Sequence, residues 1–167
     1  MTPLKGQCLI LGDDIDTDLI IPGRYLVSID RAELAPHALE PLGPEIQERL
    51  RVSPIIVAGT NFGCGSAREQ ATTCLLGAGV KAVVAASFSR VFYRNSINTG
   101  LLAITSPEAA EAATDGSVLE VDSATGTVTV DGVAFSFVPY PPELMKIVEA
   151  GGLIPYVAAQ LREESNA

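Results

Sequence analysis

Histidine and cysteine, which build most catalytic dyads and metal sites, are scarce in this chain of 167 residues. His37 is the only histidine, and the only cysteines are Cys8, Cys64 and Cys74. Because no two cysteines have Cys-x-x-Cys spacing, the sequence predicts neither a disulfide framework nor a self-contained zinc or iron–sulfur site. A single histidine also disfavours a Ser–His or Cys–His dyad, and with it a complete hydrolase site.

Basic residues are few as well. The chain has 11 Lys and Arg against 20 Asp and Glu, which gives a net charge of -9. Proteins that bind nucleic acid usually concentrate Lys and Arg, so nucleic acid is not an expected partner. No apolar stretch approaches the roughly 18 residues of a membrane span, and the run at residues 8–11 is too short for a signal peptide. We therefore expect a cytoplasmic protein without a membrane partner.

The apolar content is high enough for a compact fold. Hydrophobic residues make up 47% of the chain, and its length is about that of one domain, so we expect residues 1–167 to form a single domain. Apolar runs and helical patterns alternate over residues 54–104, which predicts an α/β fold with a parallel core sheet. Residues 118–138 carry short runs divided by turn residues, which predicts a small antiparallel appendage.

The expected elements follow from these patterns and from cap residues. The expected strands are 7–11 (resuming at 19–22 after an acidic turn), 54–59, 80–86, 101–104, 118–122, 127–130 and 133–138. The expected helices are 31–39, 45–51, 67–78, a helix capped by Ser87 or Ser89 that ends at 98–100, 107–113, 142–150 and 154–164.

The most informative segment is residues 61–70, Asn-Phe-Gly-Cys-Gly-Ser-Ala-Arg-Glu-Gln. This glycine loop follows an expected buried strand and precedes an expected helix. Gly63 and Gly65 would let backbone N–H groups approach a ligand closely, and the start of a helix favours anions. The segment therefore predicts a site that holds an anion.

Two side chains of the glycine loop have both a structural and a functional interpretation. Ser66 and Glu69 have the spacing of a capping box, and helix caps are far commoner than catalytic serines. Arg68 lies in the expected first helical turn, where the helix dipole disfavours a cation by roughly 0.3–1 kcal/mol. Its presence there favours bidentate capture of a carboxylate or phosphate, with an ion pair to Glu69 or a neighbouring acid as the alternative. A serine beside a guanidinium at a helix start also forms an alkoxide at less cost.

The acidic turn at residues 12–18, Gly-Asp-Asp-Ile-Asp-Thr-Asp, resembles the start of a calcium loop. Leu19 and Tyr25 stand where such a loop needs Gly and Glu, so calcium is not expected. On pattern alone the turn is a cluster of turn-forming and helix-capping residues.

Four segments in order, 12–22, 23–26, 61–69 and 87–100, resemble the small subunits of aconitase-like hydro-lyases, in particular those of the 3-isopropylmalate dehydratase (isopropylmalate isomerase) type. The resemblance covers nearly the whole chain. It implies the swivelling β/β/α domain of the aconitase C-terminal region. It also implies a subunit of a heteromeric enzyme that isomerises 2-isopropylmalate to 3-isopropylmalate by dehydration and rehydration, in leucine biosynthesis. The large subunit would carry the [4Fe–4S] cluster, and this chain would bind no metal and be inactive alone.

The resemblance also implies roles for single residues. Ser66 matches the serine that, as an alkoxide, takes the proton from the carbon beside a carboxylate. Arg68 matches the arginine that holds a substrate carboxylate, and Asp18 matches an aspartate of the hydrogen-bond network in the active site. Gly65 and Ala67 complete the part of the loop that would contact the dicarboxylate substrate.

This chain departs from the family pattern Gly-Ser-Ser-Arg-Glu-His, because Ala67 replaces the second serine and Gln70 replaces the histidine. Ala67 lacks a hydroxyl that can bind the substrate, a loss of about 1 kcal/mol unless another donor replaces it.

A second segment is implied to bind the substrate, and its loop after Tyr25 and Leu26, Val27-Ser28, to recognise the substrate's third substituent. It consists of Arg24, Tyr25, Leu26, Val27 and Ser28. An apolar Val27 suits an isopropyl group, whereas an arginine there would suit the extra carboxylate of homoaconitate.

Two alternatives stay open at this stage. One is a sister hydro-lyase that acts on homoaconitate, dimethylmalate or another methyl-branched diacid. The other is an anion-binding module without enzymatic activity, for which a glycine loop and a helix start would suffice.

Overall fold

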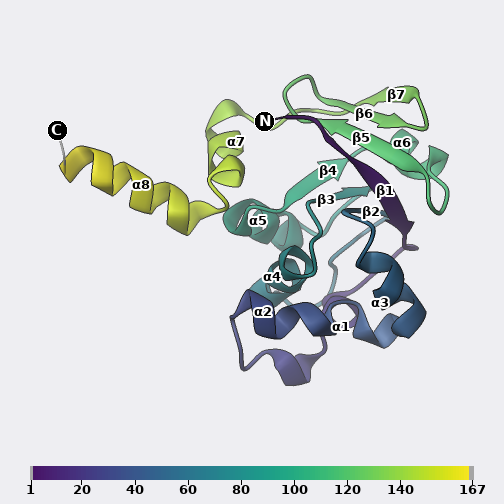
Figure 1. Cartoon of the computed structure of the whole chain (residues 1–167), viewed down its shortest axis with the longest axis horizontal. Helices are drawn as coiled ribbons and strands as arrows, with labels where there is room; N and C mark the ends of the chain where they lie inside the picture. Colours follow the sequence, from purple (N-terminus) through teal and green to yellow (C-terminus); the bar gives the residue numbers. More distant parts are fainter. Residues whose placement is uncertain (1, 166–167) are drawn as a thin grey trace.

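The structure, a computed structural model, describes residues 2–165 and is built around one seven-stranded sheet (Figure 1). In sheet order the strands are β4 (Leu102–Thr105), β3 (Ala82–Ala85), β2 (Ile55–Ala58), β1 (Leu4–Ile10), β5 (Val118–Asp122), β6 (Thr127–Val130) and β7 (Val133–Ser136). β1 to β4 pair in parallel, and β5 to β7 extend the sheet from β1 in antiparallel fashion. The predicted parallel core with an antiparallel appendage is confirmed.

Helices connect the parallel strands and follow the sheet. The α-helices are α1 (Thr17–Ile20), α2 (Arg31–Leu34), α3 (Pro44–Leu50), α4 (Glu69–Gly77), α5 (Arg90–Thr99), α6 (Pro107–Ala112), α7 (Pro142–Glu149) and α8 (Leu153–Ser165). Short 3-10 helices are η1 (Gly23–Tyr25), η2 (Ala35–His37) and η3 (Glu40–Leu42). In Figure 1, α8 extends away from the rest of the chain. Among residues 2–165, no helix has the length and apolar character that crossing a membrane requires.

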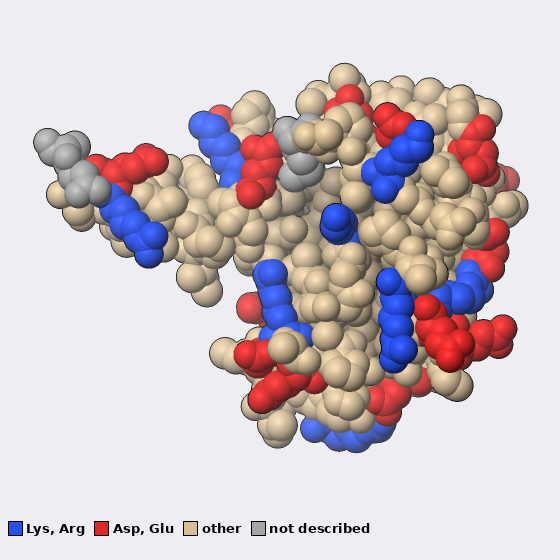
Figure 2. Space-filling model, viewed as in Figure 1, with Lys and Arg blue, Asp and Glu red and all other residues tan. Residues whose placement is uncertain are grey.

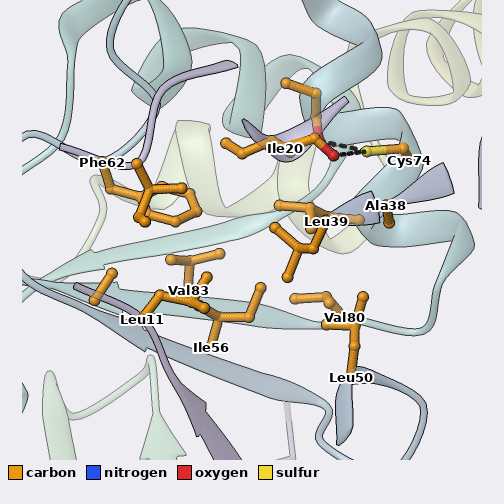
Figure 3. Packing of buried hydrophobic residues seen from close by; sticks show 14 of the residues in the cluster. Leu11, Ile20, Ala38, Leu39, Leu50, Ile56, Phe62, Cys74, Val80 and Val83 are labelled. Carbon is orange, nitrogen blue, oxygen red and sulfur yellow. Dashed lines mark hydrogen bonds between the residues drawn. The ribbon is translucent and has the colours of Figure 1, made fainter. Parts of the chain in front are cut away.

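Apolar residues cover both faces of the parallel strands, which explains why their sequences are continuously hydrophobic. In β2, Ile56 belongs to the cluster beneath the helices of the first half of the chain, and Ile55 belongs to the cluster on the other face. Figure 3 shows the first cluster, in which Phe62, Leu39 and Ile20 lie over the sheet. Helices on both faces hold the ends of the strands, and the loops that follow them, in fixed positions.

Two predictions of local structure were wrong. Residues 19–22 do not resume a strand, because the Asp16 carboxylate accepts a hydrogen bond from the Leu19 N–H at 2.9 Å and starts α1. α1 packs against α4, where the Cys74 thiol contacts the Ile20 carbonyl at 3.7 Å (Figure 3). The helix expected over 31–39 ends at Leu34 and continues as η2, since Pro36 cannot donate a backbone hydrogen bond.

Tyr140 closes part of an edge of the sheet. β4 is an edge strand, and the Tyr140 hydroxyl donates to the Ala103 carbonyl at 2.6 Å and accepts from the Ala103 N–H at 3.1 Å. Burial raises the pKa of Tyr140, which keeps the hydroxyl protonated and able to donate. One side chain thus satisfies both backbone groups of Ala103, which β4 would otherwise present at the edge of the sheet.

Tyr140→Phe should lower the free energy of unfolding by about 1–2 kcal/mol, because it leaves the Ala103 N–H and carbonyl without their partner. Urea unfolding followed by circular dichroism measures the effect. The matched control is Tyr156→Phe, which removes only a contact with Gln160 on an exposed part of α8 and should change stability by less than about 0.5 kcal/mol. Equal effects of the two substitutions would contradict the edge-closing role.

Candidate active site

The acidic turn and the glycine loop lie side by side, because they follow neighbouring parallel strands. The turn leaves β1 and the loop leaves β2, and the two strands pair in parallel. The Thr17 N–H donates to the Cys64 carbonyl at 2.9 Å, and the Gly63 N–H donates to the Ile15 carbonyl at 2.7 Å. The two segments therefore form one unit at the carboxyl ends of the strands, where α/β sheets commonly bind ligands.

Arg68 and Asp18 meet in this unit. Arg68 Nη1 lies 2.5 Å from Asp18 Oδ1 and 3.3 Å from the Ile21 carbonyl oxygen. The Arg68 side chain is 15% exposed and the Asp18 side chain 63% exposed. In the part of the chain that the structure describes, Arg68 Nη2 and Nε take part in no hydrogen bond. The guanidinium is thus held from one side and keeps two nitrogens for an anion.

The ion pair is the structural alternative that the sequence left open for Arg68. Its partner is Asp18, 50 positions away, rather than Glu69. Gly23 adjoins the same pair, since a Cβ at that position would lie 3.9 Å from both Arg68 Nη2 and Asp18 Oδ1. The pair is therefore compatible with a role in binding, because only one of the three guanidinium nitrogens is engaged.

Ser66 is exposed and stands outside the helix. α4 begins at Glu69, with Arg68 at the N-cap position and no side-chain cap, so the predicted capping box is wrong. The Ser66 hydroxyl has no hydrogen-bond partner among residues 2–165, whereas its carbonyl accepts a bond from Thr17 Oγ1 at 2.9 Å. Because the helix dipole acts mainly within the first turn and α4 begins only at Glu69, the dipole contributes little at the Ser66 hydroxyl.

The two glycines of the loop have different roles, and the prediction for Gly63 was wrong. Gly63 is buried with φ +75°, and a Cβ there would lie 2.2 Å from Phe92 Cγ. Its N–H is already bound to Ile15. Gly65, with φ +85°, is exposed, and a Cβ there would lie 3.6 Å from the side chains of Asp16 and Thr17, an ordinary van der Waals distance. Only Gly65 presents open backbone to a ligand, whereas Gly63 permits close packing.

Arg24 and Tyr25 are held by Glu40, a residue that the sequence analysis missed. Arg24 forms an ion pair with one Glu40 oxygen, and the other accepts from the Tyr25 hydroxyl at 2.9 Å. His37 lies 2.8 Å from that second oxygen and stacks on Tyr25 at 3.6 Å between ring centroids. The His37 and Tyr25 hydrogen bonds, together with Arg24, lower the pKa of Glu40. Nothing in the local sequence pattern signals this cluster, because Glu40 is 16 positions from Arg24.

The rest of the second segment lies beside the start of α4. Gln70 Nε2 donates to the Leu26 carbonyl at 3.4 Å, and Leu26 packs partly buried against the core. Val27 is 95% exposed, and the Ser28 hydroxyl bonds to Glu33. The structure therefore brings Ser66, Arg68 and Asp18 together and places the second segment next to them. Val27 points into solvent, where it is open to a ligand or a partner chain.

The cysteines stay unpaired, and no group of three or more His, Cys, Asp and Glu suited to a metal ion occurs within residues 2–165. Cys8 and Cys74 are buried, and burial raises the pKa of Cys74 to about 12. Cys64 lies in the glycine loop, where partial burial and the Asp14 and Asp16 carboxylates raise its pKa. A thiol with a raised pKa is a poor nucleophile, so Cys64 is not a candidate for covalent catalysis.

The candidate site is an open surface rather than an enclosed pocket. Ser66, Ala67 and Gly65 are all exposed. A cavity of about 590 Å³ does occur, but it lies among Lys5, Lys81 and other residues where the parallel strands begin, at the opposite end of the sheet. An open surface of this kind needs a second surface over it to exclude water from a bound acid.

Comparison with known proteins decides the family. The chain is 47% identical to the 3-isopropylmalate dehydratase small subunit of Moorella thermoacetica, over 95% of this chain and 97% of that protein. It belongs to the 3-isopropylmalate dehydratase small-subunit family. Another member, the 3-isopropylmalate dehydratase small subunit 1 of Methanopyrus kandleri, is also 47% identical, over 92% of each chain.

Structural comparison gives the same family. The crystal structure of 3-isopropylmalate dehydratase from Methanocaldococcus jannaschii matches with a TM-score of 0.89 and 36% identity, over 99% of both chains. The sequence model of the aconitase C-terminal domain family also matches this chain, over residues 43–109. These residues include the glycine loop, α4 and α5, but not the acidic turn. The predicted family and the predicted aconitase-type fold are both confirmed.

Proposed function

We propose that this chain is the small subunit of a heteromeric hydro-lyase that isomerises 2-isopropylmalate to 3-isopropylmalate by dehydration and rehydration, a step of leucine biosynthesis. Membership of the 3-isopropylmalate dehydratase small-subunit family is the observation that carries the proposal. The arrangement of Ser66, Arg68 and Asp18 on one open surface gives it a chemical basis. Residues 1–167 would form one swivel-type domain.

In this proposal Ser66 is the base and Arg68 holds a substrate carboxylate. Dehydration removes a proton from a carbon beside a carboxylate, and the electrons of that C–H bond form the double bond as hydroxide leaves. Ser66 would act as an alkoxide, whose oxygen takes that proton and becomes a hydroxyl. Its exposed side chain has no partner within the described chain, so the oxygen is open to the substrate. Arg68 Nη2 and Nε would bind the substrate carboxylate and so stabilise the negative charge that develops as the proton leaves. Asp18 fixes the guanidinium through Nη1.

Hydroxide also needs an acceptor, and we assign it to the large subunit. By resemblance, that subunit carries a [4Fe–4S] cluster. The described residues of this chain do not fit such a cluster, because no three of their His, Cys, Asp and Glu side chains are grouped so that they could hold a metal ion. The open surface around Ser66 would be covered when the two subunits meet.

The remaining partners follow from charge and cysteine chemistry. We propose a small dicarboxylate as the substrate and neither nucleic acid nor a membrane as a partner. Figure 2 shows basic side chains interspersed with acidic ones on the visible face rather than gathered into one patch, in keeping with the net charge of -9. The three free cysteines suit a reducing compartment, so we place the protein in the cytoplasm.

The test is co-expression with a cluster-bearing large subunit, followed by assay of the purified pair on 2-isopropylmalate, homoaconitate and dimethylmalate. The proposal expects turnover of isopropylmalate by the pair and none by either subunit alone. Preference for homoaconitate or dimethylmalate would favour a sister hydro-lyase. Binding of diacids without turnover by any pairing would favour the anion-binding module and contradict the proposal.

The identity of residue 27 should tune the choice of substrate. Val27→Arg should raise the ratio of kcat/KM for homoaconitate to that for isopropylmalate by about 10-fold or more, because a guanidinium can bind the extra carboxylate while disfavouring an isopropyl group. The matched control is Val138→Arg, at a valine that is 89% exposed but lies beyond β7. An unchanged ratio in Val27→Arg would contradict the assignment of this segment to substrate recognition.

A further inference from the structure

Thr17 contacts the glycine loop on both sides of Gly65. Its N–H donates to the Cys64 carbonyl at 2.9 Å, and its hydroxyl donates to the Ser66 carbonyl at 2.9 Å. The side chain is 2% exposed, so water does not compete for the hydroxyl. These two bonds join Thr17 to the carbonyl groups of the residues before and after Gly65, which is 48 positions away in the sequence.

The loop around Ser66 has few other restraints. Gly65 carries no side chain, and its φ is +85°. A glycine can leave this backbone conformation for others at little cost. α4 fixes the backbone only from Glu69 onward. The Ser66 side chain makes no contact of its own with a described hydrogen-bonding group. The hydroxyl of Thr17 is therefore the tertiary contact that holds the Ser66 peptide unit.

The same short helix holds the loop at a second point. Thr17 faces inward to the Ser66 carbonyl, and the next residue, Asp18, is exposed and pairs with Arg68. Asp16 starts the helix through its bond to the Leu19 N–H. The single helical turn α1 thus holds both the backbone of Ser66 and the side chain of Arg68, and so fixes their relative positions.

We propose that Thr17 is a positioning residue for Ser66: its hydroxyl fixes the Ser66 backbone so that the serine oxygen is held where it takes the substrate proton. This inference rests on the proposed function. Displacement of a reacting group by about 1 Å can cost on the order of 100-fold in rate. The buried Thr17 site has room for a valine of nearly the same shape, so loss of the hydroxyl can be separated from loss of packing.

The experiment compares Thr17→Val with Thr17→Ser in the assembled enzyme. Thr17→Val should lower kcat by about 10- to 100-fold and change KM for isopropylmalate by less than about 2-fold, since Arg68 still binds the carboxylate. Thr17→Ser retains the donor and should keep kcat within about 3-fold of the wild-type value. In a Ser66→Ala background, Thr17→Val should cause no further loss, because the oxygen that it positions is gone.

The matched control is Thr99→Val. Thr99 is also buried, and its hydroxyl also donates to a backbone carbonyl, that of Asn95 at 2.8 Å, near the end of α5. Thr99→Val should destabilise the protein about as much as Thr17→Val does, but it should not lower kcat. Amide exchange provides a second readout: Thr17→Val should speed exchange at the amides of residue 17 and Gly63, whose hydrogen bonds join the acidic turn to the loop, and Thr99→Val should not.

The possible results separate the inference from the proposed function. Three results, each with an active wild-type enzyme, would overturn the inference alone. They are a normal kcat in Thr17→Val, equal losses of kcat in Thr17→Val and Thr99→Val, and a loss of kcat in Thr17→Ser as large as that in Thr17→Val. A wild-type pair that turns over no diacid would overturn the proposed function, and the role of Thr17 with it. If Thr17→Val fails to assemble with the large subunit, the amide exchange rates of the isolated subunit decide the question: unchanged exchange at residue 17 and Gly63 would overturn the inference.

Discussion

Ser66→Ala should lower kcat of the assembled enzyme by about 10²- to 10⁴-fold, the usual contribution of a positioned proton-transfer group. The serine hydroxyl is exposed and unpartnered within the described chain, so its removal breaks no bond that holds the fold. KM, melting temperature and co-purification with the large subunit should stay close to wild-type values. Steady-state assays on isopropylmalate, with gel filtration of the complex, measure these quantities.

The control for this prediction lies in the same loop. Cys64→Ala changes a partly buried side chain two positions away, and the Cys64 carbonyl that Thr17 binds stays in place. It should keep kcat within about 3-fold of wild type, because its raised pKa gives the thiol no part in the chemistry. Full activity in Ser66→Ala would reject the assignment of the base, whereas equal losses in both variants would point to loop structure instead.

Arg68→Lys should raise KM by about 10- to 100-fold, even though the charge is kept. Lysine can replace the bond from Nη1 to Asp18, but it lacks the planar fork that leaves Nη2 and Nε for a carboxylate. Each charge-assisted hydrogen bond contributes about 1.5–3 kcal/mol, which sets the size of the expected effect. Initial rates over a range of isopropylmalate concentrations give KM and kcat separately.

A second arginine provides the comparison. Arg49 also pairs with an aspartate, Asp115, on the surface between α3 and the segment after α6. Arg49→Lys should leave both constants unchanged, because a surface ion pair contributes little and no substrate group is assigned there. If Arg68→Lys binds substrate as tightly as wild type, Arg68 serves only its contacts with Asp18 and the Ile21 carbonyl, and the carboxylate must be held elsewhere.

Much of the fold could be predicted because short-range patterns determine it. Continuous apolar runs such as β2 occur where a strand is covered on both faces, and Gly100 ends α5 in the left-handed conformation as a helix C-cap. The apolar run at 19–22 was misread because its cap, Asp16, lies in the acidic turn. Hydrophobicity alone cannot distinguish a short buried helix from a short buried strand.

The candidate site was predicted in part. Ser66 and Arg68 could be named from the glycine loop, but the capping box and the ligand-facing role of Gly63 were wrong. Both errors have the same cause. A pattern of residue types shows which conformations are permitted, whereas Phe92 packing on Gly63 and Thr17 holding the loop are contacts from distant parts of the chain.

The sequence by itself determined the family and most of the strands and helices, and it named Ser66 and Arg68 as the residues that we propose deprotonate and bind the substrate. Only the tertiary structure decided that Asp18 pairs with Arg68, 50 positions away, and that Thr17 holds Ser66, 49 positions away. The physical reason is the parallel pairing of β1 with β2, which brings the two following loops to the same edge of the sheet. Register between strands is a property of the folded chain, and no local pattern of residues specifies it.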